Sequence, residues 1–299
     1  MNTSLPPVVE SRADLARALA DVTATGPRAV VMTMGGLHAG HARLMRIARE
    51  KVGDDGYVIA TIFVNPLQFA ANEDLDKYPR TFDVDVAMCG EQAVDLVFAP
   101  TPDVMYPHGD PVVTVDPGDL GLQYEGAARP THFRGVLTVV LKFLQLTQPD
   151  FAIFGEKDYQ QLTLVRRMVS DLDVPVEIVP GPTGREESGL AMSTRNKYLS
   201  ARARATADRM PAAIEAAQIA AADGANAAIE AARAVLEAPS DVEVDVQYIV
   251  VTDPLMGPAP SWGEGRIILA AIVDGTRLLD NAPVQLGTPA DAGGAGSAK

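Results

Sequence analysis

The chain has 299 residues, of which 47% are hydrophobic and 21% charged, a composition typical of a globular protein large enough for two domains. Its single cysteine, Cys89, excludes an internal disulfide and any metal site built from several cysteines. The formal net charge of −14 disfavours nucleic acid as a partner, so an anionic ligand needs local positive charge to bind.

The sequence also carries information about location. It contains no run of 18 uninterrupted apolar residues, so we expect no membrane span and no membrane partner. The first residues, MNTSLPPVVESR, lack the basic start and the apolar stretch of a secretory signal. Together with the lone cysteine, these features predict a cytoplasmic protein.

Residues 1–183 predict a Rossmann-like domain, because apolar runs typical of strands alternate with stretches of helical periodicity. Strands are predicted at 28–33, 57–65, 95–100, 151–155 and 175–180. Helices are predicted at 41–52, 81–94 (with Thr81 as the N-cap), 135–147 and 159–170. We therefore expect an α/β fold with a doubly wound parallel sheet, in which ligands bind at the carboxyl ends of the strands.

Residues 184–286 predict a second, smaller α+β domain. Alanine-rich helix is predicted at 201–238 with a break at 222–226, and strands at 245–251 and 265–281. Asp274-Gly275, inside the last of these ranges, is a strong hairpin turn signal. The remaining residues, 287–299, are small and polar, so we expect a disordered tail there.

Two of the four histidines, His38 and His41, follow the first predicted strand in the stretch TMGGLHAGH. A zinc site is one interpretation, although His108, His132 and Cys89 do not stand at metal-site spacing. A histidine pair in the core is a second. Phosphate binding is a third, because glycines let the backbone approach a ligand and a helix start offers free N–H groups and a positive dipole. The absence of G-x-G-x-x-G here disfavours a nicotinamide dinucleotide.

The stretch GLAMSTRNKYL (189–199) carries Ser193, Thr194 and Arg195 beyond the fifth predicted strand. By itself this is an ordinary loop composition. With the HxGH pattern, however, it resembles the two signatures of the nucleotidylyl-transferase superfamily, in which a loop cation and hydroxyls hold a triphosphate. Arg195 would then be the charge-assisted donor.

Three further stretches place polar residues after predicted strands. In FGEKDYQQL (154–162), Lys157 is either a solvated surface lysine or a group that neutralises an α-phosphate, with Gln161 near the same pocket. In IFVNPLQF (62–69), Asn65 and Gln68 are either turn and surface residues or hydrogen-bonding partners of a small hydroxylated substrate. In RPTHFRGVLTVVLK (129–142), His132 lies between two arginines, which alone could form an exposed basic patch.

Taken together, these stretches resemble one family. TMGGLHAGH, IFVNPLQF, YPRT, RPTHFRGVLTVVLK, FGEKDYQQL and GLAMSTRNKYLS occur in the order and spacing of the pantothenate synthetase family, the pantoate–β-alanine ligases. The resemblance covers about residues 8 to 285. It implies ATP-dependent condensation of D-pantoate with β-alanine through a pantoyl adenylate, with ATP as substrate, Mg²⁺ as cofactor and a homodimer as the assembly.

The resemblance also implies roles for individual residues. His41 would be the proton donor and would act in catalysis with His38, Lys157 and Arg195. The ATP-binding residues it implies are Met34, Gly35, His38, Gly40, His41, Gly155, Lys157, Asp158, Gly184, Met192, Ser193, Thr194 and Arg195. Pantoate and β-alanine would be bound by Gln68, Gln161, Asn65 and His132, and Asp85 is a metal-ligand candidate.

The sequence departs from the family pattern at several positions. Met32 replaces a proline, Ala39 a glutamate and Thr194 a serine, and only the last keeps its functional group. Val84-Asp85 stands where many relatives carry two adjacent acidic residues, so the phosphates and water would supply most magnesium ligands. Gly184 replaces a larger side chain, which leaves adenine contact to the backbone.

Other functions stay open at this point. Another transferase of the same superfamily is the nearest alternative, whereas the short, acidic chain argues against an aminoacyl-tRNA synthetase. A cytidylyltransferase would leave RPTHFRGV and the two glutamines unexplained. A catalytically dead relative that binds or regulates is a further alternative, against which the retained histidines, Lys157 and Arg195 argue.

Overall fold

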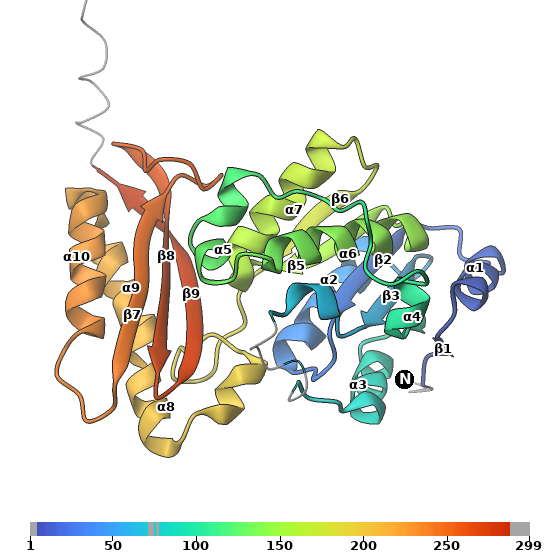
Figure 1. Cartoon of the computed structure of the whole chain (residues 1–299), viewed down its shortest axis with the longest axis horizontal. Coiled ribbons are helices and arrows are strands. Elements are labelled where there is room, and N and C mark those ends of the chain that lie inside the picture. Colours follow the sequence, from blue (N-terminus) through green and yellow to red (C-terminus); the bar gives the residue numbers. More distant parts are fainter. Residues whose placement is uncertain (1–4, 71–74, 76–77, 288–299) are drawn as a thin grey trace, which may run out of the picture. The chain divides into compact units, whose positions relative to one another are not determined.

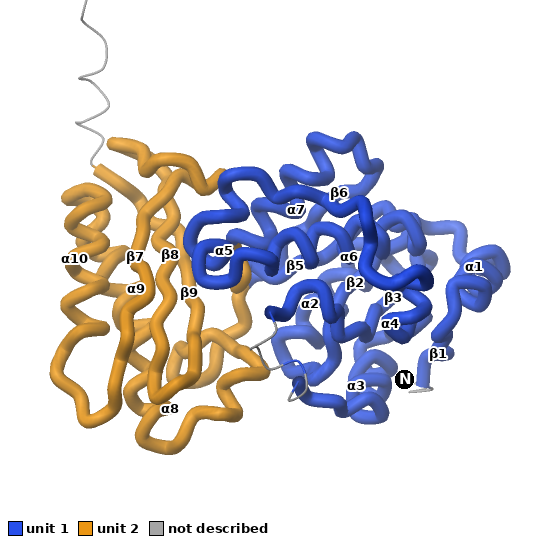
Figure 2. The backbone as a smooth tube through the Cα atoms, viewed as in Figure 1, with its two compact units in different colours: residues 1–156, 160–182 blue, residues 157–159, 183–299 orange. Residues whose placement is uncertain are grey.

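The computed structural model describes residues 5–70, 75 and 78–287, and it divides into two compact units (Figures 1 and 2). Unit 1 comprises residues 1–156 and 160–182, and unit 2 comprises 157–159 and 183–299. The boundary predicted near residue 183 differs from this division in the short segment 157–159, which belongs to unit 2. The predicted tail lies outside the described residues, apart from Gly287.

Unit 1 is built on a parallel six-stranded sheet of strand order β1-β4-β3-β2-β5-β6. Its strands are β1 (Val8–Val9), β2 (Arg28–Thr33), β3 (Tyr57–Ile62), β4 (Leu96–Phe98), β5 (Phe151–Gly155) and β6 (Glu177–Gly181). The central strands are apolar on both faces because both faces are covered, as the continuous runs in the sequence predict.

Helices lie on both faces of this sheet (Figure 1). They are α1 (Arg12–Ala20), α2 (Ala39–Val52), α3 (Phe82–Glu91), α4 (Pro102–Met105), α5 (Glu125–Ala128), α6 (His132–Thr147) and α7 (Tyr159–Asp171). On one face, Met45 of α2 and Val86 of α3 join a cluster with Val31. On the other, Phe143 of α6 meets the ring of Phe98 edge-on at 6.0 Å. The predicted doubly wound α/β architecture is therefore confirmed.

The strand order places a topological switch point beside β2. From β2 the chain steps outward to β3 and β4, and then returns past β2 to β5 on its other side. In open parallel sheets, ligands bind outside the carboxyl ends of the strands at such a point. The residues that follow β2 and β5 are thus the first places to look for a site in unit 1.

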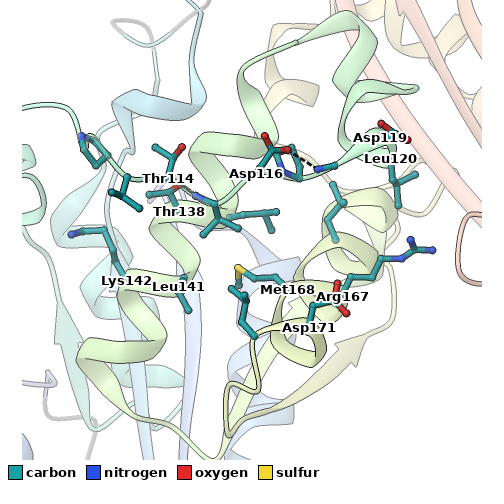
Figure 3. A pocket seen from close by; sticks show the side chains of 18 residues that line it. Thr114, Asp116, Asp119, Leu120, Thr138, Leu141, Lys142, Arg167, Met168 and Asp171 are labelled. Carbon is teal, nitrogen blue, oxygen red and sulfur yellow. Dashed lines mark hydrogen bonds between the residues drawn. The ribbon is translucent and has the colours of Figure 1, made fainter.

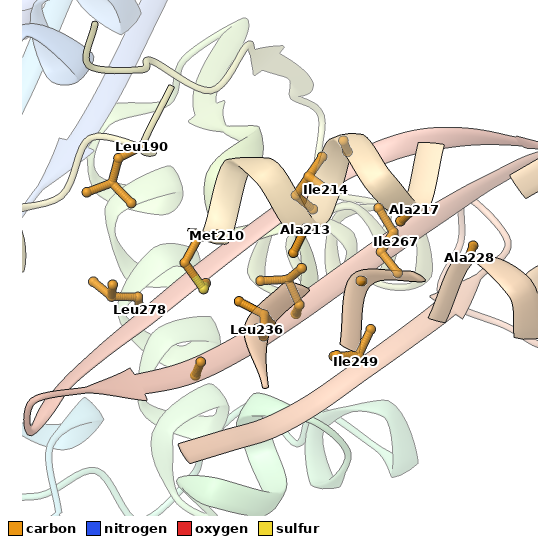
Figure 4. Packing of buried hydrophobic residues seen from close by; sticks show 14 of the residues in the cluster. Leu190, Met210, Ala213, Ile214, Ala217, Ala228, Leu236, Ile249, Ile267 and Leu278 are labelled. Carbon is orange, nitrogen blue, oxygen red and sulfur yellow. The ribbon is translucent and has the colours of Figure 1, made fainter. Parts of the chain in front are cut away.

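Unit 2 contains an antiparallel sheet covered by alanine-rich helices. Its elements are α8 (Ala201–Ala207), α9 (Arg209–Ala220), α10 (Ala225–Leu236), β7 (Val244–Thr252), β8 (Gly263–Val273) and β9 (Thr276–Leu286). Ala213 and Ala217 let α9 pack closely against Leu236 and Ile267 (Figure 4). Asp274 and Gly275 both have positive φ, 48° and 76°, as the predicted hairpin turn requires. The smaller α+β domain is confirmed.

The differences from the sequence-based elements have local causes. β3 ends at Ile62, three residues early, and Asn65 then caps a short 3₁₀ turn over Pro66–Gln68. α2 begins at Ala39, two residues early, because His38 caps it. β1 is only two residues long, too short to give a pattern. Within the described part of the chain, no helix combines the length and apolarity needed to span a bilayer.

Candidate functional site

The loop between β2 and α2 is held in place by a buried carboxylate. Gly35 and Gly36 take positive φ values of 79° and 62°, which turn the chain sharply at the end of β2. Asp85, only 1% exposed, accepts hydrogen bonds from the N–H groups of Gly36 (2.9 Å) and Leu37 (2.8 Å), one on each carboxylate oxygen. The backbone that leads into His38 therefore has a fixed course.

The two histidines of the loop form a capping box at the start of α2. Nδ1 of His38 accepts the Gly40 N–H at 3.1 Å, and Nδ1 of His41 accepts the His38 N–H at 3.3 Å. Their ring centroids are 4.2 Å apart. Because both Nδ1 atoms accept, each neutral imidazole carries its proton on Nε2. This arrangement adds two ring N–H donors to the helix N-terminus, which suits an anion.

Asp85 was also the candidate metal ligand. Besides the two loop amides, it accepts a hydrogen bond from the Thr81 hydroxyl at 3.1 Å. Thr81 is the N-cap of α3, as predicted, but its side chain makes no capping bond, since the hydroxyl is directed to Asp85. Across the described ranges, no cluster of three or more His, Cys, Asp or Glu side chains could hold a metal ion. A metal role for Asp85 stays a prediction.

The turn after β3 carries a buried network of amides. Nδ2 of Asn65 donates to the Gly135 carbonyl and to Oε1 of Gln68, both at 3.1 Å. Oδ1 of Asn65 accepts from the Tyr106 hydroxyl at 2.8 Å and from the Leu67 N–H at 3.3 Å. Asn65 therefore serves the turn, as one of its two interpretations predicts, and its side chain also contacts that of Gln68.

The start of α6 closes on the same turn. Nδ1 of His132 lies 3.0 Å from the backbone carbonyl oxygen of Gln68, and Nη2 of Arg129 donates to the same oxygen at 3.2 Å. Nη1 of Arg129 lies 3.2 Å from Nε2 of His132, so the imidazole proton belongs on Nδ1. Nε2 of Gln68 reaches the Met34 sulfur at 2.8 Å. Unit 1 thus brings together four predicted site residues: Met34, Asn65, Gln68 and His132.

The two neighbouring glutamines of α7 have different surroundings. Gln160 is buried and accepts from the Glu125 N–H while donating to the carbonyls of Leu120 and Gln123. It therefore fixes the segment before α6. Gln161, the predicted substrate ligand, is half-buried, as is Gly155 at the end of β5.

In unit 2, the segment with Lys157 and Asp158 is anchored to β9. Nδ2 of the buried Asn281 donates to the Lys157 carbonyl at 2.8 Å, and Nε of Arg266 donates to Oδ1 of Asn281 at 2.8 Å. The Arg266 guanidinium stacks 3.7 Å from the ring centroid of Tyr159. Nζ of Lys157 lies 3.3 Å from the Asp158 carboxylate. Unit 2 thus fixes the backbone of the predicted phosphate ligand.

The loop of unit 2 that carries the Ser-Thr-Arg stretch is also well braced. The Met192 N–H donates to the Gly184 carbonyl at 2.8 Å, which closes the loop at its base. Ser193 caps the 3₁₀ turn Thr194–Tyr198 by accepting the Arg195 N–H at 3.2 Å. Asn196, buried, donates to the Ala191 carbonyl at 3.0 Å. Ser193, Thr194 and Arg195 are all half-buried.

A cavity of about 810 Å³ lies elsewhere in unit 1, between α6, α7 and the segment 111–120 (Figure 3). Its lining is largely apolar, with Lys142 and Arg167 among the charged groups. None of the predicted site residues lines it. Cys89 is no candidate nucleophile either, because burial raises the pKa of its thiol to about 12.

Sequence reasoning missed three residues that the structure connects to the predicted site. Tyr106 and Gly135 contact Asn65, and Asn281 contacts Lys157. Each lies at least 41 positions from its partner along the chain. No local pattern marks Tyr106 or Asn281, and Gly135 lies within the stretch RPTHFRGVLTVVLK without standing out there, because the importance of all three comes from tertiary contacts.

Comparison with known proteins gives consistent results. The family model described as pantoate-beta-alanine ligase matches residues 7–283. A pantothenate synthetase from a Nocardioides species is 51% identical, covering 97% of this chain and 89% of that protein.

Two solved structures are similar as well. The pantothenate synthetase of Thermus thermophilus has a TM-score of 0.84 at 42% identity, covering 92% of this chain and 98% of that one. A pantoate-beta-alanine ligase of Francisella tularensis, complexed with beta-gamma ATP and beta-alanine, has a TM-score of 0.77 at 29% identity, covering 93% and 97% of the two chains.

Proposed function

Because the chain belongs to the pantoate–β-alanine ligase family, we propose that it condenses D-pantoate with β-alanine through a pantoyl-adenylate intermediate. The pantoate carboxylate attacks the α-phosphorus of ATP and pyrophosphate leaves. The β-alanine amine then attacks the acyl carbon and AMP leaves as the amide forms. Both steps join groups that positioning and fixed charge can bring together without a covalent enzyme intermediate.

Unit 1 supplies donors for the triphosphate. The observation that carries the proposal is the His38–His41 capping box, which puts two Nε2 donors at the N-terminus of α2, beyond the carboxyl end of the central strand. The Nε2–H of His41 donates a hydrogen bond to the phosphate oxygens as charge develops on them. Met34, Gly35, Gly40 and Gly155, at or near the ends of β2 and β5, line the nucleotide site.

Unit 2 carries positive charge and hydroxyls that suit the phosphates of a nucleotide. Lys157 neutralises the α-phosphate, and Arg195 holds the triphosphate together with Ser193 and Thr194. Asp158 contacts the ribose, while Gly184 and Met192 contribute their backbone. The hydrogen bonds that fix the carbonyl of Lys157 and the N–H of Arg195 support these roles, since preorganised donors lower the cost of reaching the transition state.

Pantoate binds to Gln68 and Gln161, and β-alanine lies near Gln68, with His132 and Asn65 beside them. Mg²⁺ would be held mainly by the phosphates of ATP, because the described residues offer it no carboxylate cluster and Asp85 already serves the loop amides. We further propose a homodimer and a cytoplasmic location.

The experiment that tests the adenylate step is ATP–pyrophosphate exchange with D-pantoate and Mg²⁺, without β-alanine. Pantoate-dependent exchange is expected from the wild-type chain. Its absence in a folded sample that binds ATP would favour another acceptor substrate or a non-catalytic relative.

The same assay tests His41. His41→Ala should lose roughly 100-fold or more of the exchange rate, the size of one transition-state donor, and keep the fold. His108→Ala is the matched control, because His108 is exposed in unit 1 and belongs to no predicted site. Exchange close to the wild-type rate in a folded His41→Ala protein would remove His41 from the mechanism.

A further inference from the structure

We propose that Tyr106 is a positioning residue that acts through Asn65 to hold Gln68 with its amide N–H groups directed to pantoate. The proposal rests on the role of Gln68 in pantoate binding proposed above. It adds a residue that no sequence motif marks. It also fixes which end of the Gln68 amide meets the substrate.

The orientation of the Asn65 amide follows from two backbone groups. The Gly135 carbonyl can only accept, so the Asn65 atom 3.1 Å from it is the nitrogen. The Leu67 N–H can only donate, so the Asn65 atom 3.3 Å from it is the oxygen. Neither contact permits the flipped amide.

The orientation of Gln68 follows in turn. The second N–H of Asn65 points at the Gln68 amide at 3.1 Å, so Gln68 must present its oxygen there. Its nitrogen is then directed away from Asn65 and lies 2.8 Å from the Met34 sulfur. A thioether is a weak acceptor, so a carboxylate or hydroxyl oxygen of pantoate is the better partner for this nitrogen.

Tyr106 completes the hydrogen bonding of Asn65. Its hydroxyl donates to Oδ1 of Asn65 at 2.8 Å, so two donors and two acceptors now occupy the whole capacity of that amide. Asn65 therefore has no hydrogen-bonding group left for the substrate. Asn65 therefore orients Gln68 and does not itself bind the substrate.

Tyr106 is itself held firmly. The side chain is 7% exposed, the ring lies 6.2 Å from that of Phe63, and the Lys142 ammonium is 5.5 Å from its centroid. Burial raises the pKa of the hydroxyl, so it remains a donor through the neutral range. A fixed donor at this point keeps the Asn65 amide from turning.

The test compares the KM for pantoate with the KM for ATP in Tyr106→Phe, a variant that removes only the hydroxyl. We expect the KM for pantoate to rise about fivefold, the weight of one neutral hydrogen bond, with the KM for ATP unchanged. Tyr57→Phe is the matched control, because Tyr57 begins β3 at the opposite, amino end of the sheet. Thermal unfolding of each variant checks the fold.

A double-mutant cycle tests the route. In a Gln68→Ala background, Tyr106→Phe should change pantoate affinity little, because the group it orients is gone. An unchanged pantoate KM in a folded Tyr106→Phe protein, an equal rise for ATP, or a further fivefold loss on top of Gln68→Ala would overturn the proposal. A wild-type enzyme without pantoate-dependent turnover would instead overturn the proposed function, and this proposal with it.

Discussion

At the scale of single residues, Asp85 shows how a side chain outside a ligand site can determine its geometry. Gly35 and Gly36 allow the loop to turn sharply, and the same conformational freedom would allow it to adopt other conformations. The Asp85 carboxylate, which lies on the neighbouring helix α3, removes this freedom by accepting hydrogen bonds from two consecutive N–H groups of the loop. His38 and His41 therefore start from a backbone whose position is already fixed.

Asp85→Ala should lower the free energy of unfolding by about 2–3 kcal/mol, because two buried amides lose a charged acceptor. The pyrophosphate exchange rate should also fall, since the loop before His38 would no longer be held. Urea unfolding and the exchange assay measure the two effects. Asp83→Ala removes an exposed carboxylate from the first turn of the same helix; it should leave the exchange rate unchanged and lower stability by less than about 1 kcal/mol, the weight of a helix-dipole contact. A fully active Asp85→Ala protein would show that the loop before His38 keeps its conformation without the Asp85 carboxylate.

At the scale of elements, the turn after β3 and the helix α6 depend on close contact. A methyl group on Gly135 would lie 2.3 Å from the Leu67 carbonyl oxygen and 2.7 Å from the Gln68 nitrogen. Glycine is thus needed here for the approach of two backbones. The contact brings the Gly135 carbonyl to Asn65 and His132 to Gln68.

Gly135→Ala should therefore cost about 2–3 kcal/mol of stability, despite the better helix propensity of alanine, because backbone must move away from backbone. Pantoate binding should weaken at the same time, as the amide network opens. Chemical denaturation and the pantoate KM are the measurements. Gln145→Ala, at an exposed position of α6, is the control and should be neutral or slightly stabilising. Unaltered stability in Gly135→Ala would mean that the two elements are not in close contact.

At the scale of the whole molecule, each unit has a hydrophobic cluster of its own (Figure 4 shows that of unit 2). Unit 2 also contains a buried ion pair. Both oxygens of Asp280, which is 1% exposed, accept from the Arg185 guanidinium at 2.7 and 2.9 Å. These bonds raise the pKa of Arg185 and tie the 184–192 loop to β9. Local stability can then differ between the units.

Asp280→Ala should destabilise unit 2 by about 2–3 kcal/mol, somewhat less than a fully buried pair would, because Arg185 keeps contact with water. Hydrogen exchange followed by mass spectrometry should show faster exchange in β7, β8 and β9, with little change in β2 and β3. Asp245→Ala, an exposed carboxylate on β7, is the control. Equal acceleration in both sheets would indicate that the two units unfold together.

The sequence by itself determined the fold class and most elements, because burial on both faces of a parallel strand and the alternation of strand with helix leave local patterns. The Asp274-Gly275 turn was predictable for the same reason, since positive φ restricts the residue types. The family was predictable from six short stretches, each of which keeps polar side chains at the end of a strand or at the start of a helix.

Only the tertiary structure decided how those side chains are oriented. The protonated nitrogen of each histidine, the end of the Gln68 amide that faces away from Asn65, and the anchoring of Lys157 by Asn281 all depend on hydrogen bonds. Tyr106, Gly135 and Asn281 reach their partners across 41, 70 and 124 positions of the chain. A local pattern records the period of an element, whereas a hydrogen bond between distant segments exists only after the chain has packed.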